Sequence, residues 1–178
     1  MKPVLAALLA ALALPALAQH QHYAGMEQRE IKALSPEQVK QYQAGAGMGY
    51  AMPAELNRFP GPMHVLELAD KLGLTPDQHA KVQSLMDMHK TEARALGAKR
   101  VESERALEAL FRSGKVEEGA LAKSVRDAAA LEGEFRLSHL ETHRRTRALL
   151  TEEQVARYVQ LRGYGGGSSP AKHGGHRH

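Results

Sequence analysis

The segment LTPDQHAKVQSLMDMHKTEARALGAKRVESERALEALFRSGK, residues 74–115, decides the fold of this chain. It opens with a helix start signal. Thr75 can cap the first free backbone N–H groups, and Gln78 can reach back to the cap residue. Ala, Leu, Glu, Lys, Arg and Gln dominate the rest of the segment, and these residue types favour helix. The first strong break comes at residues 113–115, so we predict one long helix over 76–112.

The same start signal occurs three times, always as a leucine, a Ser or Thr cap and a Gln three residues after the cap. The copies are Leu34-Ser35-Pro36-Glu37-Gln38, Leu74-Thr75-Pro76-Asp77-Gln78 and Leu150-Thr151-Glu152-Glu153-Gln154. With the breaks, they predict four helices in the main domain, over 63–72, 76–112, 116–149 and 152–162. The short connection makes the two long helices antiparallel neighbours. Gly97 and Gly133 lie inside them and mark bends or a close backbone approach. The predicted fold class is all-α: a long antiparallel helical hairpin, two short flanking helices and an irregular N-terminal arm.

The chain divides into four segments. Residues 1–18 combine Lys2, an apolar run and the small residues Ala16 and Ala18, which is typical of a secretory signal peptide cleaved after Ala18. The alternative for this run is a buried N-terminal helix; it is too short to span a membrane. Residues 19–62 are predicted to form an N-terminal arm, mostly irregular with one short helix. Residues 63–163 form the helical hairpin domain, and residues 164–178 a disordered His/Gly-rich tail.

The composition excludes several classes of protein. None of the 178 residues is cysteine, which rules out disulfides, thiolate metal sites and a lipid-modified cysteine. The net charge is only +4 and aromatic residues make up 4% of the chain. A nucleic-acid-binding surface would cluster basic residues with stacking aromatics, so we expect no nucleic-acid partner. No later segment is apolar for long enough to cross a bilayer, and we expect no membrane span after signal cleavage.

Three histidines fall on the apolar faces of the two long helices. At 100° per residue, His139 and His143 lie together on the apolar side of the second long helix. His89 lies on the apolar side of the first, beside Met86. Counting back from the break places His89 opposite Leu140, between the other two histidines. Buried imidazoles need a partner for each nitrogen, and a divalent ion can be shared by several of them.

We therefore predict a metal site between the helices, with His64 of the short first helix as a further ligand. Its predicted ligands are His89, His139, His143, His64 and Met86, and the candidate ions are Zn, Ni, Co and Cu. The alternative is that these histidines are core or partly exposed polar residues and that Met86 is core packing. Histidines near the chain ends either bind metal weakly or only add solubility; they are His20, His22, His173, His176 and His178.

The paired motifs Leu74-Thr75-x-x-Gln78 and Leu150-Thr151-x-x-Gln154, behind a signal peptide and without cysteine, resemble the Spy/CpxP family. The resemblance implies a periplasmic all-α protein, often a dimer with a curved surface. Members include ATP-independent chaperones, stress-response adaptors, and proteins that respond to zinc, nickel or cobalt and hold the ion with His, Glu and Met. This chain departs from the metal-responsive members. Leu68 stands where they have a second first-helix histidine, and its third helix has His139-x-x-x-His143 instead of His-x-x-x-Met.

Two functions remain open on this basis. The first is a periplasmic metal-binding or metal-sensing protein that holds a divalent ion between helices. Its candidate partners are a membrane sensor protein and a second copy of this chain, which would form a homodimer. The alternative is a metal-independent chaperone or envelope-stress adaptor whose basic residues help bind unfolded clients, namely Arg94, Lys99, Arg100, Arg144, Arg145 and Arg147. We expect no enzyme. His139-Leu140-Glu141-Thr142-His143 lacks the Glu directly after the first His that a zinc hydrolase uses as its base.

Overall fold

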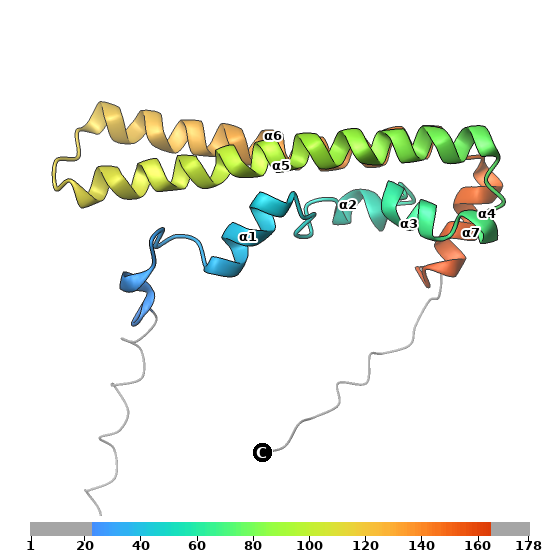
Figure 1. Ribbon diagram of the computed structural model, residues 1–178, viewed down its shortest axis with the longest axis horizontal. Coiled ribbons are helices and arrows are strands. Elements are labelled where there is room, and N and C mark those ends of the chain that lie inside the picture. The colour runs from blue at the N-terminus through green and yellow to red at the C-terminus, as the bar shows by residue number, and fades with distance from the viewer. Residues whose placement is uncertain (1–22, 165–178) are drawn as a thin grey trace, which may run out of the picture.

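A computed structural model describes residues 23–164, and its main feature is a long helical hairpin (Figure 1). Helix α5 (Pro76–Arg112) and helix α6 (Glu118–Ala148) run antiparallel. All the shorter helices lie along one side of this hairpin. No strand occurs within residues 23–164, so the predicted all-α class is confirmed for the described chain. The predicted signal peptide and most of the predicted tail lie outside the described residues.

The ends of the long helices agree with their capping residues. Thr75 and Gln78 form the predicted reciprocal capping box, and α5 begins at Pro76. Helix α6 begins at Glu118, two residues after the predicted start. Its N-cap residue, Glu117, makes no side-chain hydrogen bond, so no capping signal in the sequence marks this boundary. Within the described residues no helix is long and apolar enough to cross a membrane.

The glutamines of the two repeated motifs bind each other at the open end of the hairpin. The side-chain amide of Gln78 donates to Oε1 of Gln154 at 2.9 Å, and that of Gln154 donates to Oε1 of Gln78 at 3.0 Å. Gln78 also donates to the carbonyl of Leu149, and Gln154 to that of Gly73. Each glutamine therefore caps its own helix and satisfies a carbonyl at the end of another helix. We refer to this arrangement as the glutamine junction.

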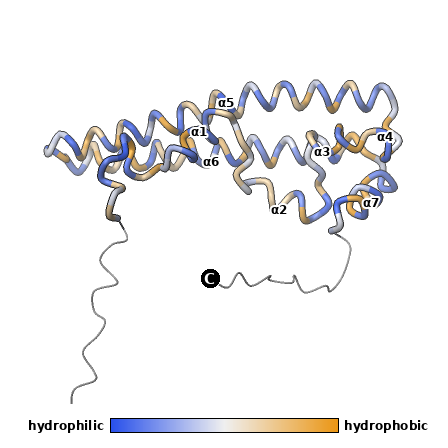
Figure 2. Tube along the Cα trace, turned by 60° about the horizontal axis from the view of Figure 1, so that its bottom comes forward, coloured by the Kyte–Doolittle hydropathy of each residue, from blue (hydrophilic) through white to orange (hydrophobic). Residues whose placement is uncertain are grey.

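Short helices pack around the glutamine junction. The predicted helix over 63–72 is split at Leu68 into α3 (Pro62–Glu67) and α4 (Ala69–Leu72), and helix α7 (Glu152–Leu161) comes after α6. Figure 2 shows hydrophobic segments gathered where α3, α4 and α7 meet. The buried members of this core are Val65, Leu72, Val82, Leu150, Val155 and Tyr158.

The N-terminal arm packs along the hairpin. It contains a 3-10 turn at Met26–Gln28, helix α1 (Pro36–Ala44) and helix α2 (Met52–Glu55). Helix α1 starts at the first copy of the capping signal, as predicted. Helix α2 is a single turn and a second helix in the arm, for which the sequence predicts only one short helix; a proline in its first turn favours it.

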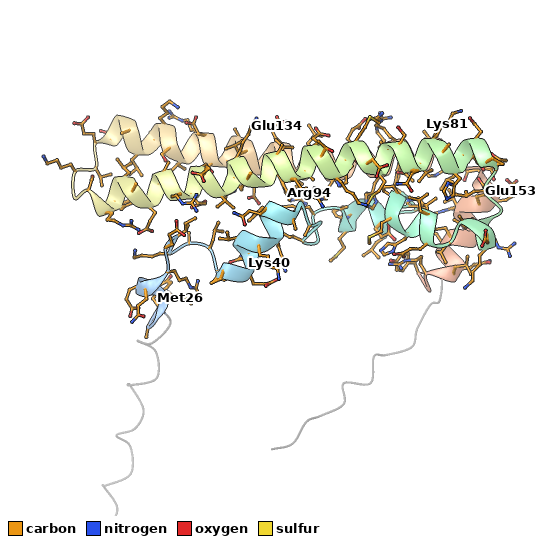
Figure 3. All side chains as sticks on the ribbon, in the orientation of Figure 1. Met26, Lys40, Lys81, Arg94, Glu134 and Glu153 are labelled. Carbon is orange, nitrogen blue, oxygen red and sulfur yellow. The ribbon has the colours of Figure 1, made fainter. Side chains whose placement is uncertain are left out.

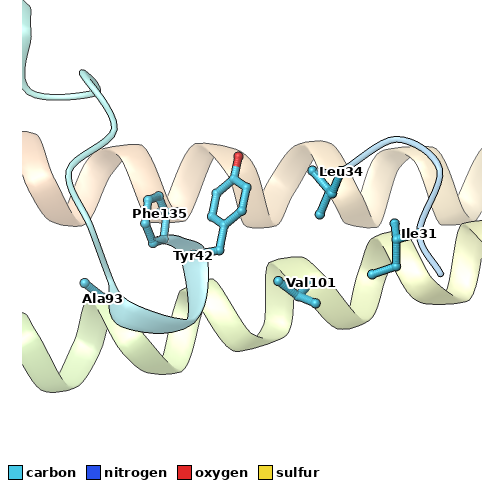
Figure 4. Packing of buried hydrophobic residues seen from close by; sticks show 6 residues of the cluster. All are labelled: Ile31, Leu34, Tyr42, Ala93, Val101 and Phe135. Atoms are coloured by element: carbon cyan, nitrogen blue, oxygen red, sulfur yellow. The ribbon is translucent and has the colours of Figure 1, made fainter. Parts of the chain in front are cut away.

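Helix α1 approaches α5 so closely that only glycine fits between the two backbones. A Cβ built on Gly97 would lie 1.8 Å from the carbonyl oxygen of Tyr42. This contact explains one of the two glycines that the sequence places inside the long helices. Around it, side chains of the arm and the hairpin form a second core, made of Ile31, Leu34, Tyr42, Ala93, Val101 and Phe135 (Figure 4).

A cluster of polar residues borders this second core. Arg100 donates to Glu132 at 2.9 Å and to Glu104 at 2.5 Å, and the hydroxyls of Tyr42 and Tyr50 also donate to Glu132. Burial alone would raise the pKa of Glu132, but the hydrogen bonds from Tyr50 and Arg100 outweigh it and lower that pKa. The carboxylate therefore stays charged and holds the arm to α6.

Candidate metal centre

His89 of α5 and His139 of α6 meet face to edge between the two long helices. Their ring centroids are 4.6 Å apart and their planes are inclined at 85°. Phe135 lies 4.7 Å from His139 on one side, and Tyr50 of the arm 6.4 Å away on another, both measured between ring centroids. The register counted from the sequence puts His89 opposite Leu140, and the structure pairs it with the preceding residue.

Each ring of this pair has a buried nitrogen without a hydrogen-bond partner. The atoms are Nδ1 of His89 and Nε2 of His139. In His139 the other nitrogen, Nδ1, donates to the carbonyl oxygen of Phe135 at 2.8 Å, so in the neutral ring Nε2 is the nitrogen with the lone pair. A buried acceptor without a donor is unfavourable, and a bound cation would satisfy it.

His143 and His64 are hydrogen-bonded in the same way as His139, through Nδ1. Nδ1 of His143 donates to the carbonyl oxygen of Phe59 at 2.8 Å, and Nδ1 of His64 donates to the carboxylate of Glu67 at 2.8 Å. In the neutral form of each ring, Nε2 is therefore the nitrogen with the lone pair. This is how proteins orient metal-binding histidines, with one nitrogen held by an oxygen and the other offered to the ion.

The surroundings keep at least two of these rings neutral. Burial, followed by the proximity of His139 and His143, lowers the pKa of His89 to about 4. Burial also lowers the pKa of His143, and the nearby His139 and His64 act in the same direction, against the opposing effects of Phe59 and Glu55. A neutral imidazole is the form that binds a metal ion, so both rings are in the ligand form at neutral pH.

The five predicted ligands are not all gathered at one point. His89 and His139 are in contact, and His143 interacts electrostatically with both of them and with His64. Met86 is half-buried on α5, three residues before His89. Among residues 23–164, no three His, Cys, Asp or Glu side chains stand where they could hold one ion. The geometry offers a pair of imidazoles with further histidines beside it, and metal binding stays a prediction.

Glu55 of α2 is a residue of this region that the sequence does not predict. Its carboxylate accepts from the hydroxyl of Tyr158 at 2.5 Å and from the backbone N–H of Gly61 at 3.1 Å, and it lies 3.6 Å from Nδ1 of His143. The hydroxyl of Tyr164 also donates to this carboxylate, and the guanidinium of Arg162 forms an ion pair with it. Glu55 occurs in a Gly- and Pro-rich stretch without helical periodicity, so no pattern in the sequence marks it.

Comparison with known proteins identifies the family. The model of the LTXXQ motif family matches residues 62–162, which is more than half of the chain and includes both glutamines of the junction. No curated protein and no solved structure matches the chain. The match agrees with the resemblance to Spy/CpxP proteins that the two motifs indicate. On this evidence the chain belongs to the LTXXQ motif family.

Proposed function

We propose that this protein is a periplasmic, non-catalytic member of the Spy/CpxP type that binds a divalent transition-metal ion between α5 and α6. His89 and His139 are the primary ligands, and His143 and His64 are the candidates for completing the coordination. Zinc, nickel, cobalt and copper ions all accept imidazole ligands, and a cysteine-free site in an exported protein suits them.

The observation that carries this proposal is the pair of buried ring nitrogens without partners. Ordinary core histidines have their polar atoms paired, because each unpaired buried group costs roughly 1–3 kcal/mol. Here the Phe135 carbonyl fixes the tautomer of His139 so that its lone pair remains free inside the protein. An ion between the two helices would satisfy both nitrogens, and its binding free energy would stabilise the hairpin.

Titration of the full chain, purified without a histidine affinity tag, tests the proposal. Isothermal calorimetry and thermal melts with Zn²⁺, Ni²⁺, Co²⁺ and Cu²⁺ should show binding and a higher melting temperature. His139→Phe keeps the ring volume and should abolish the high-affinity phase, as should His89→Ala. His79→Ala is the matched control, because His79 is exposed on the same helix. A high-affinity phase that survives in His139→Phe would refute the site, as would its absence in the wild type.

A second candidate function is a metal-independent chaperone or stress adaptor, and exposed apolar side chains favour it. Met52, Leu56 and Leu137 are 57%, 56% and 56% exposed. Two of them, Met52 and Leu56, line an open hollow together with Gly49, Pro53, Asn57 and Arg136. Half of the basic side chains assigned to this function are neutralised in ion pairs, namely Arg100, Arg144 and Arg147. Suppression of client aggregation in the presence of chelator, unchanged in His139→Phe, would favour this function over the first.

A further inference from the structure

Carboxylates accept most of the hydrogen bonds that tie the N-terminal arm to the hairpin. Near the loop end of the hairpin, the ammonium group of Lys32 donates to Glu108 of α5 at 2.5 Å. The carboxylate of Glu30 accepts from the guanidinium of Arg105, also on α5, at 2.8 Å. Arg112 adds a bond to the backbone carbonyl of Glu30, and its guanidinium lies 3.7 Å from Glu108. Two pairs of opposite charge therefore cross from the arm to α5 at this place.

A second tie lies midway along the hairpin, at the carboxylate of Glu132 in α6. It accepts from the hydroxyls of Tyr42 and Tyr50 in the arm and from Arg100 of α5. Arg100 also donates to Glu104, so this guanidinium is shared by two carboxylates. Because Glu132 is bonded to the arm and to α5 while it belongs to α6, its charge affects the attachment of all three segments.

The carboxylates at the two ties bind protons less readily in the folded chain than in the unfolded one. The hydrogen bond from Lys32 lowers the pKa of Glu108 below its ordinary value of 4.5. Burial raises the pKa of Glu132, but the hydrogen bonds from Tyr50 and Arg100 outweigh it, and the net shift is downward. The stability that these charges contribute is therefore complete above pH 4.5 and is lost as the pH falls through the lower folded values.

The contacts that close the other end of the hairpin carry no such charge. The glutamine junction consists of side-chain amides and backbone carbonyls, which do not titrate in this pH range. Acid therefore weakens the attachment of the arm at Glu108 and Glu132 without weakening the junction.

We propose that residues 30–44, which contain α1, form an acid-released latch on the hairpin. The latch is docked at neutral pH and leaves the hairpin when Glu108 and Glu132 take up protons, while the glutamine junction stays closed. Ala93 and Val101 are 0% and 1% exposed in the core beneath the latch, so its release uncovers an apolar face of α5 (Figure 4). The pH then decides whether this face is available to an apolar segment of another protein.

Apolar burial alone does not secure the latch. Its buried side chains are Ile31, Leu34 and Tyr42. Docking must order the whole segment, and α1, with nine residues, is too short to persist as an isolated helix in water. The charged contacts therefore decide the balance between the docked and the released state.

Spin labels on α1 and α6 measure the release directly. The chain has no cysteine, so Lys40→Cys on α1 and Glu134→Cys, on the opposite side of the hairpin, attach two labels uniquely (Figure 3). In the presence of chelator, the electron–electron distances should form one narrow peak at pH 7 and a broad distribution at longer distances at pH 3. Circular dichroism should retain the signal of the long helices. An unchanged distribution at pH 3 would overturn the latch, as would unfolding of the hairpin in the same step.

Two substitutions reproduce the effect of acid at pH 7, without changing the charge of the histidines. Glu108→Gln and Glu132→Gln in one chain replace both carboxylates by neutral amides of similar shape. We expect the backbone amides of α1 to exchange hydrogen about 10-fold faster than in the wild type, because hydrogen bonds to charged groups contribute more than neutral ones. Asp127→Asn is the matched control, since it removes a carboxylate that pairs with Lys123 inside α6, and it should leave the exchange of α1 unchanged. Equal exchange in the double variant and the wild type would overturn the latch.

Discussion

Gly97→Ala should destabilise the protein although it places a better helix former inside α5. On an open helix surface this substitution stabilises by roughly 1 kcal/mol. Here the new Cβ would lie 1.8 Å from the carbonyl oxygen of Tyr42, which is backbone and cannot rotate away. Helix α1 must therefore move off α5, and the core between them must open.

The magnitude depends on the side chains that α1 and the preceding turn bury. Ile31, Leu34 and Tyr42 are 3%, 6% and 5% exposed against the hairpin. Burying one such side chain contributes roughly 1.5–3 kcal/mol, so partial loss of the three outweighs the gain in helix propensity. We expect Gly97→Ala to lower the free energy of unfolding by about 2–4 kcal/mol.

Urea unfolding followed by circular dichroism at 222 nm measures this difference. Gly133→Ala in α6 is the control, and it should raise the free energy of unfolding by about 0.5–1 kcal/mol, because its Cβ meets nothing within 4 Å. The same substitution is thus expected to have opposite signs in the two long helices. A Gly97→Ala protein as stable as the wild type, with the arm equally protected from hydrogen exchange, would refute the docking argument.

Three further measurements address the other contacts. Gln78→Ala and Gln154→Ala should each destabilise the protein by about 1–2 kcal/mol. A double-mutant cycle should show a coupling energy of about 1 kcal/mol, because the two amides bind each other. Gln38→Ala is the control, since it removes only a local capping box, and it should cost about 0.5–1 kcal/mol. Independent effects of the two motif glutamines would contradict the junction. In the presence of chelator, the free energy of unfolding should fall by about 1–2 kcal/mol between pH 7 and pH 5. Burial and neighbouring imidazoles lower the pKa of His89 from 6.5 to about 4, so the unfolded chain takes up the proton first. The contribution of His89 to stability is therefore complete above the unfolded pKa and declines toward pH 4. His89→Leu should flatten this slope, and an unchanged slope would show that the ring does not titrate as described. Tyr158→Phe should destabilise by about 1 kcal/mol in urea unfolding, because Glu55 loses its shortest hydrogen bond. No change would mean that this hydroxyl does not hold Glu55 of α2 against α7.

The parts of the fold set by local chemistry could be predicted from the sequence. Capping residues placed the starts of α1, α5 and α7, because the hydrogen bonds that fix these starts lie within four residues of chain. The start of α6 was misplaced by two residues, since Glu117 gives no such signal. The break at Leu68 has no signal in the sequence either, because neither glycine nor proline stands there; Leu68 is partly buried against the core around the glutamine junction.

The candidate site could be predicted in part. Helical periodicity and a short connection are enough to bring His89 within one residue of its observed neighbour, because both helices are continuous from the connection at residues 113–115 to the histidines. The packing of residues 47–61 beside these histidines could not be foreseen. It depends on contacts between segments distant in the chain, such as Glu55 with Tyr158, and these leave no periodic trace.

The glutamine junction also limits how hairpins of this kind can change length. Because the two amides must meet at one end, a residue inserted in α5 alone would rotate every later side chain of that helix relative to α6 and misalign the opposed faces. Additions that preserve the pairing must come as matched turns on both helices, next to the connection at residues 113–117. The loop end is therefore the place where related chains can become longer or shorter, while the glutamine end fixes the register of the two helices.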